Sequence, residues 1–271
     1  MATPTPRPPS RWGSNARPAL LLFGLGLLGV IAALPVSLDL VRDAMAALPD
    51  APELSPAGEV ALATLNPTLL LAAAVVLGLV FAPRVGLRSH LVAWSRGDGT
   101  PCTALRRELP LALGLGVAVG VSLAALDRLT AMLFVRELAD LAWPAGRTLA
   151  VTLAGVLYGG ITEELLLRWG IMSLLVWLLW RLTGRGAPRP TPTLAWVAIM
   201  VTAVAFGLLH LPALSAMAPL TAGLIARTVL LNAIGGAVYG WLFWRRSLES
   251  AMVAHAITHV AMSALALLPI G

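Results

Sequence analysis

Residues 162–170 read Thr-Glu-Glu-Leu-Leu-Leu-Arg-Trp-Gly and lie inside an apolar run that extends from about Leu149 to Leu182. On insertion scales, one charged side chain at the centre of a membrane-spanning helix costs roughly 2.5–3.5 kcal/mol. Two adjacent carboxylates and an arginine in one such run therefore indicate a functional site. The stretch predicts a membrane-embedded helix that carries polar chemistry.

Glu164 and Arg168 are four residues apart. On a helix they share one face, with the acid on the favoured N-terminal side. The side chain of Glu163 points about 100° away and has no basic partner on its own helix. We therefore expect Glu164 to be an ion-paired, structural carboxylate. Glu163 is expected to be the free carboxylate, which can act as a general base.

The composition indicates a membrane protein. Of the 271 residues, 58% are hydrophobic and 12% are charged, whereas about 25% of the residues in a soluble protein are charged. All 19 basic residues are arginines, and the formal net charge is +6. These arginines gather in short loops between apolar runs, which is typical of membrane orientation. We therefore expect the lipid bilayer, and no nucleic acid, as a partner.

The apolar residues fall into seven runs, at 20–34, 60–82, 109–126, 149–182, 194–211, 223–244 and 251–268. Counting arginines in the loops gives a cytoplasmic N-terminus and seven spans. We interpret the first run as an uncleaved span, because no small-x-small cleavage site follows it. The fourth run would form a helix roughly 50 Å long against a hydrocarbon core of roughly 30 Å. It must tilt, project from the bilayer or break near Gly170, and a break would make eight spans.

Three of the four histidines lie in the later apolar runs. His255 and His259 are four residues apart and face the same way on a helix. His210 lies at the end of an earlier run, and the fourth, His90, lies in a basic loop where we expect it to be solvated. These groups and the Glu-Glu-Arg stretch predict one intramembrane polar site.

Antiparallel pairing of neighbouring runs would bring these groups together. If the run that contains the glutamates pairs with the next run, His210 is level with the glutamates. If the last two runs pair, His255 and His259 are level with about Gly240 and Gly236. Glycine allows close helix approach and leaves room for the rings.

Two carboxylates and three imidazoles in a dry cavity suit water activation, in which a carboxylate takes a proton from water and imidazoles stabilise the oxyanion. The same side chains could hold one divalent metal ion, zinc first of all. The candidate ligands are Glu163, His210, His255 and His259. A His-Glu-x-x-His helix is absent, so the chain has no zincin-type site.

Several motifs occur in a fixed order: Glu163-Glu164-x-x-x-Arg168-x-Gly170, Phe206-x-x-x-His210, a glycine-rich run, Arg-Arg-Ser-Leu-Glu-Ser at 245–250, and His255-x-x-x-His259. This ordered set resembles the CPBP family of CAAX-protease and bacteriocin-processing intramembrane proteases, which is related to the type II CAAX prenyl endopeptidases. The resemblance covers roughly residues 148–268. The first 147 residues do not contribute to it.

The resemblance implies roles for the polar residues. Glu163 and His210 would activate water, with Glu164 and Arg168 as support. His255 would stabilise the oxyanion.

The family usually has asparagine at the position of His259. An imidazole can also donate a hydrogen bond, and it could ligate a metal. The resemblance does not decide between a metal-dependent mechanism and one that uses glutamate-activated water.

We therefore predict an all-α polytopic membrane protein with about seven to eight transmembrane helices and an intramembrane polar site. Residues 1–18 would be a disordered basic tail, 19–147 about three N-terminal transmembrane helices, and 148–271 the CPBP-like catalytic core. The predicted activity is hydrolysis of a peptide bond in a membrane-associated protein or peptide, either CAAX-type and prenylated or a peptide precursor. We expect a multi-pass protein of the cytoplasmic membrane of a prokaryote, and a metalloendopeptidase if a metal is bound.

Two other functional classes fit the buried polar groups. Carboxylates and histidines also build the proton relays of transporters, but transporters usually have internal repeats, and none is visible here. A non-catalytic immunity or scaffold protein would not need intact Glu163, Glu164, His210 and His255. The sequence therefore favours the peptidase.

Overall fold

The computed structural model describes residues 13–50, 52–98, 100–133, 148–183, 187–216 and 218–267. Within these residues the chain is helical and contains no strand. Six helical segments in this part are long and apolar enough to cross a membrane. The predicted fold class, an all-α polytopic membrane protein, is confirmed.

The elements follow one another as α1 (Gly13–Ala46), α2 (Pro56–Phe81), η1 (Pro83–Val85), α3 (His90–Ser95), α4 (Pro101–Leu133), α6 (Leu149–Ala154), η2 (Gly155–Glu163), η3 (Leu165–Met172), α7 (Ser173–Thr183), α8 (Pro192–Leu208), α9 (Leu211–Ser215), α10 (Ala222–Arg245) and α11 (Leu248–Ala266). Each of the seven apolar runs coincides with a long helical segment. Helix α11, which contains a glutamate and two histidines, is the one of these segments that is not among the six apolar enough to cross a membrane.

Residues 13–18, which we expected to belong to a disordered tail, are helical. Residues 1–12 lie outside the described part of the chain, but residues 13–18 already belong to α1. The side chain of Asn15 accepts a hydrogen bond from Arg96 Nη2 at 2.8 Å. This contact with the end of α3 gives the polar start of α1 a partner, so the helix continues beyond its apolar run.

The segment from Leu149 to Thr183 is one continuous helical element, made of α6, η2, η3 and α7. The possible break near Gly170 does not occur. Instead, η2 and η3 are π-helical. The wider π-turns hold more residues per turn and are frequent at functional sites. Glu163 lies at the end of η2 and Arg168 in η3, and Glu164 lies between the two π-helical segments.

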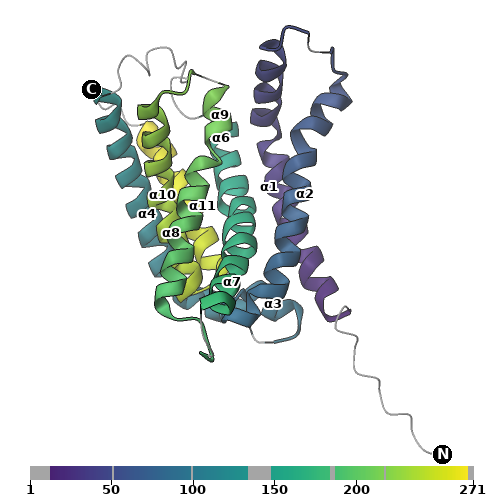
Figure 1. Cartoon of the computed structure of the whole chain (residues 1–271), viewed down its shortest axis with the longest axis vertical. Coiled ribbons are helices and arrows are strands. Elements are labelled where there is room, and N and C mark those ends of the chain that lie inside the picture. The colour runs from purple at the N-terminus through teal and green to yellow at the C-terminus, as the bar shows by residue number, and fades with distance from the viewer. Residues whose placement is uncertain are drawn as a thin grey trace, which may run out of the picture.

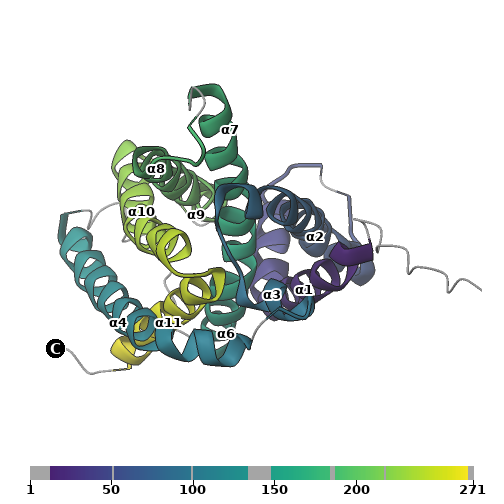
Figure 2. The ribbon, with the colours of Figure 1, turned by 90° about the horizontal axis from the view of Figure 1, so that it is seen from below.

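This segment lies between two groups of helices. On one side, α1 contacts η2 and α2 contacts η3. On the other side, α11 contacts η2 and α8 contacts η3, while α4 packs along α11 and α10 along α8 (Figures 1 and 2). The Glu-Glu-Arg stretch therefore faces helices that carry the histidines on one side and the N-terminal helix pair on the other.

The turn between α10 and α11 is tied to the start of α3. Glu249 is 5% exposed, and its carboxylate accepts hydrogen bonds from Ser89 Oγ at 2.5 Å and from the backbone N–H groups of His90 and Leu91 at 2.9 and 3.0 Å. The backbone of Leu248 also donates to the carbonyl of Arg88 at 3.1 Å. Glu249 thus caps α3 from another helix and fixes the first turn of α11.

A second carboxylate strengthens this junction. Glu108 Oε2 accepts hydrogen bonds from Ser247 and Ser250 at 2.5 and 2.6 Å, and His90 Nε2 lies 3.2 Å from the same oxygen. The His90 side chain is only 14% exposed, so our expectation of a solvated loop histidine is wrong. His90 follows a basic loop in the sequence, but its side chain is largely buried at this junction because Glu108 of α4 is its partner.

Replacement of Glu249 by glutamine should destabilise the protein. The amide oxygen can accept only part of the three hydrogen bonds and lacks the charge that strengthens them. We expect a loss of about 1–3 kcal/mol, measured as a lower unfolding temperature in detergent. Glu53→Gln is the control, because Glu53 is exposed and should tolerate the change. Equal unfolding temperatures for the two variants would contradict a structural role of Glu249.

Candidate active site

The Glu164–Arg168 pair is fully buried. Arg168 Nη1 lies 3.3 Å from Glu164 Oε1, and both side chains are 0% exposed, which confirms the predicted i,i+4 ion pair. Arg168 Nη2 donates to the carbonyl of Gly236 at 2.9 Å. The guanidinium carbon lies 5.0 and 5.6 Å from the ring centroids of Phe206 and Tyr239, within the range of cation–π attraction. The pair joins η3 to α8 and α10.

His255 contacts both glutamates. Its Nδ1 lies 2.9 Å from Glu164 Oε1, and its Nε2 lies 3.9 Å from Glu163 Oε2. Because an ionised carboxylate can only accept, His255 Nδ1 carries the hydrogen in this bond. The bond fixes the ring so that Nε2 faces Glu163. Glu163 is 17% exposed whereas Glu164 is fully buried, so the two carboxylates occupy different environments, as the sequence predicted.

His259 stacks on His255. Its Nε2 lies 3.3 Å from His255 Nε2, and the ring centroids are 5.1 Å apart with an interplanar angle of 22°. Gly155 and Gly159 of η2 make room for the His259 ring: an added Cβ would lie 2.4 Å from His259 Nδ1 at the first position and 2.8 Å from His259 Nε2 at the second. Two glycines on the π-helical segment thus allow close approach of α11.

The two glycines to which we assigned this role contact other groups. An added Cβ at Gly236 would meet Ala203, and one at Gly240 would meet Ile199. The predicted pairing of α10 with α11 is nevertheless confirmed, because Tyr239 of α10 stacks on His255 with centroids 4.4 Å apart. The helix pairing was correct, but these glycines point toward α8.

Tyr239 is a site residue that the motifs do not identify. It is 1% exposed, and its hydroxyl donates to Thr258 Oγ1 at 2.8 Å. One face of its ring covers His255, and Arg168 lies near the same ring. The pairing of α10 with α11 is the one sequence signal for Tyr239, because it places the neighbouring residue, Gly240, level with His255.

His210 joins the cluster through Phe206. Its Nδ1 lies 2.8 Å from the carbonyl oxygen of Phe206. A carbonyl only accepts, so this nitrogen carries the hydrogen, and a neutral ring has its acceptor lone pair at Nε2. The Phe206 ring meets both imidazoles edge-on, with centroids 4.8 Å from His210 and 5.7 Å from His255. Phe206 therefore links the second motif to the third.

The donor chemistry fits a metal only in part. His210 and His255 each donate from Nδ1 to an oxygen, as metal-bound histidines usually do, and the 3.3 Å between His255 Nε2 and His259 Nε2 would suit two ligands of one ion. A catalytic zinc ion takes three protein ligands, however. Within the described ranges, no three His, Cys, Asp or Glu side chains converge on one point. These residues do not form a complete zinc site, so zinc binding remains a prediction.

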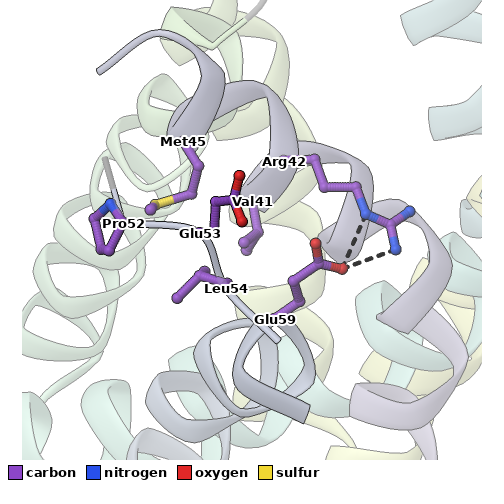
Figure 3. Close-up of a pocket in the computed structure, with 7 residues that line it drawn as sticks. All are labelled: Val41, Arg42, Met45, Pro52, Glu53, Leu54 and Glu59. Carbon is purple, nitrogen blue, oxygen red and sulfur yellow. Dashed lines mark hydrogen bonds and ion pairs between the residues drawn. The ribbon is translucent and has the colours of Figure 1, made fainter. Parts of the chain in front are cut away.

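A surface hollow lies at the connection from α1 to α2, away from this cluster (Figure 3). Its lining residues are Val41, Arg42, Met45, Pro52, Glu53, Leu54 and Glu59. The ion pair inside it, between Arg42 and Glu59 at 2.8 Å, is an ordinary exposed contact of small energetic value. None of the predicted site residues lines this hollow.

A family model described as "Type II CAAX prenyl endopeptidase Rce1-like" matches residues 145–261. The match includes all six predicted site residues: Glu163, Glu164, Arg168, His210, His255 and His259. Neither the curated proteins nor the solved structures gave a match. Helices α1 to α4 lie before the matched region. The part of the chain that carries the motifs, residues 145–261, is therefore similar to the type II CAAX prenyl endopeptidase Rce1-like family, in agreement with the motif resemblance to the CPBP proteases.

Proposed function

We propose that the protein is an intramembrane endopeptidase in which Glu163 activates a water molecule. The observation that carries the proposal is the contrast between the two adjacent glutamates. Glu164 is ion-paired and fully buried, whereas Glu163 is 17% exposed and faces His255 Nε2 at 3.9 Å. A carboxylate with open access in an otherwise buried polar cluster suits a general base.

In the proposed reaction, Glu163 takes one proton from water and the resulting hydroxide attacks the carbonyl carbon of the scissile peptide bond. His210 would accept a hydrogen bond from the same water, since its Nε2 holds the lone pair in the neutral ring. The tetrahedral intermediate carries a negative oxygen. Its collapse breaks the C–N bond, and protonated Glu163 returns its proton to the leaving amine. The products are a carboxylic acid and an amine.

The histidines of α11 would hold the oxyanion. His255 Nε2 faces Glu163 and lies 3.3 Å from His259 Nε2. Because His255 Nδ1 donates to Glu164, Nε2 of the same ring can donate to the oxyanion only when the ring carries a hydrogen on both nitrogens. Preorganised donors of this kind lower the barrier because they need no reorganisation when the charge develops. Glu164, Arg168 and the Tyr239 ring would keep His255 in place. No step requires a metal.

The proposed substrate is a membrane-associated protein or peptide. The family name supports a prenylated CAAX substrate, and a peptide precursor without a prenyl group is the second class. We further propose that the protein lies in the cytoplasmic membrane of a prokaryote with its N-terminus inside. Exposed arginines between α2 and α4, such as Arg84 and Arg96, and Arg106 in the first turns of α4 support this orientation.

The decisive experiment compares protein termini in membranes from cells that contain the wild type, Glu163→Gln or the exposed control Glu53→Gln. New termini at membrane depth should appear with the wild type and Glu53→Gln but not with Glu163→Gln. A farnesylated CAAX peptide and its unprenylated copy, offered to the purified protein, separate the two substrate classes. Proton flux into vesicles that depends on Glu163, without any Glu163-dependent cleavage, would make the protein a transporter instead.

A further inference from the structure

Helix α1 contacts the back of the turn that presents Glu163. Thr162, the residue before Glu163, is fully buried, and its Oγ1 donates a hydrogen bond to the carbonyl of Gly26 in α1 at 2.7 Å. Buried threonines in membrane helices usually bond to their own helix, as Thr202 does to the carbonyl of Ala198 at 2.8 Å. Thr162 instead reaches a different helix.

The surface of α1 is shaped for this contact. At Gly29, an added Cβ would lie 2.2 Å from Thr162 Oγ1 and 2.5 Å from the carbonyl oxygen of Leu157. No side chain larger than hydrogen fits there without a backbone shift. Gly24 lies on the same helix, and an added Cβ there would meet nothing within 4 Å. The contact with the backbone of η2 is therefore made at Gly29 and not on the side of α1 that carries Gly24.

Thr162 and Glu163 lie on different faces of the same turn. Thr162 is directed at α1, whereas Glu163 is partly exposed and directed at His255. The π-helical turn that carries them has wider, less regular hydrogen bonding than an α-helix, so an external contact contributes much to its position. A catalytic group must be held to within about 0.5 Å of its productive position.

We propose that α1 positions the Glu163 carboxylate, with Thr162 as the positioning residue and Gly26 to Gly29 as the docking face. The inference rests on the proposed role of Glu163 as general base. It gives a catalytic purpose to a helix that lies outside the region matched by the family model. Thr162 does not touch substrate in this scheme, so its effect should fall on the chemical step and not on substrate binding.

The test uses the full-length protein in lipid vesicles and the substrate whose termini depend on Glu163. Thr162→Val removes the hydroxyl at nearly constant shape and should lower kcat about tenfold, the rate equivalent of one net hydrogen bond, with KM within about twofold. Thr162→Ser keeps the hydroxyl and should restore most of the rate. Gly29→Ala should lower kcat up to about a hundredfold by displacing the turn, whereas Gly24→Ala should leave it unchanged.

Deuterium uptake of the η2 amides gives a readout that needs no cleavage. Thr162→Val should raise uptake over residues 155–163, and the matched substitution Thr202→Val should not. The positioning role alone is overturned if the wild type cleaves the substrate and Thr162→Val cleaves it at the same rate. It is also overturned if Thr162→Val and Thr202→Val show the same deuterium uptake over residues 155–163. A wild type without Glu163-dependent cleavage overturns the proposed function, while the uptake comparison still decides whether α1 holds this turn.

Discussion

Replacement of Glu163 by glutamine should abolish peptide cleavage and leave the folded, inserted protein intact. The amide has nearly the shape of the carboxylate but cannot take a proton from water at neutral pH. Loss of a general base typically costs roughly 10²–10⁴ in rate, which places the variant near or below detection. Because Glu163 is 17% exposed and its carboxylate lies 3.9 Å from His255 Nε2, its replacement removes little stabilising interaction.

The same substitution at Glu164 should have a different result. Glu164 is the ion-pair partner of Arg168 at 3.3 Å and the acceptor for His255 Nδ1 at 2.9 Å. Glu164→Gln leaves a fully buried guanidinium without a counter-charge, and breaking a buried pair in this way costs about 3–5 kcal/mol. Activity should fall as well, because His255 loses the charge that holds its ring.

Unfolding temperature in detergent and cleavage rate, measured together, separate the two roles. We expect Glu163→Gln to unfold like the wild type without cleaving, and Glu164→Gln to unfold at a lower temperature. The exposed control Glu53→Gln should match the wild type in both measurements. The assignment is reversed if Glu164→Gln is as stable as the wild type while Glu163→Gln is not.

The sequence predicted the fold because its signals are local. Apolar runs and arginine-rich loops depend on composition over about 20 residues, so every run reappears as a helical segment. The pairing of neighbouring helices is also local, and it correctly placed His255 beside the glycine-rich part of α10. In contrast, the hydrogen bond between Ser89 and Glu249 joins residues that are 160 positions apart in the sequence. No periodic pattern reports such a contact.

The charged residues of the site could be predicted from the sequence, but the residues that pack around them could not. Glu164 and Arg168 reveal their pairing by spacing alone, because i,i+4 residues share a helix face. Tyr239 and Gly159 act through the shape of neighbouring helices, and tyrosine and glycine are ordinary residues in an apolar span. The π-helical turns are a further case: η2 packs against α1 and α11, and the spacing of apolar residues does not mark a π-turn. The burial of His90 could not be predicted for the same reason, because its partner, Glu108, is on another helix.

His259 is the position at which this chain departs from the usual asparagine of the related proteases, and its replacement tests the chemistry of the site. The ring lies 3.3 Å from His255 Nε2 and fits against Gly155 and Gly159. If His259 donates a hydrogen bond to the oxyanion, asparagine should serve nearly as well, because its amide also donates. Alanine should not, since loss of one oxyanion donor typically costs roughly 10²–10³ in turnover.

A metal role predicts another pattern. Asparagine is a poor ligand for zinc beside imidazole, so His259→Asn should then fail almost as badly as His259→Ala and should lose the bound ion. Cleavage and metal content are therefore measured together for the wild type and both variants, before and after treatment with a chelator. We expect His259→Asn to retain most activity, because in the described residues His255 and His259 do not gather a third metal-binding side chain. An asparagine variant that loses both activity and metal, with a chelator-sensitive wild type, would replace the oxyanion role of His259 with metal binding.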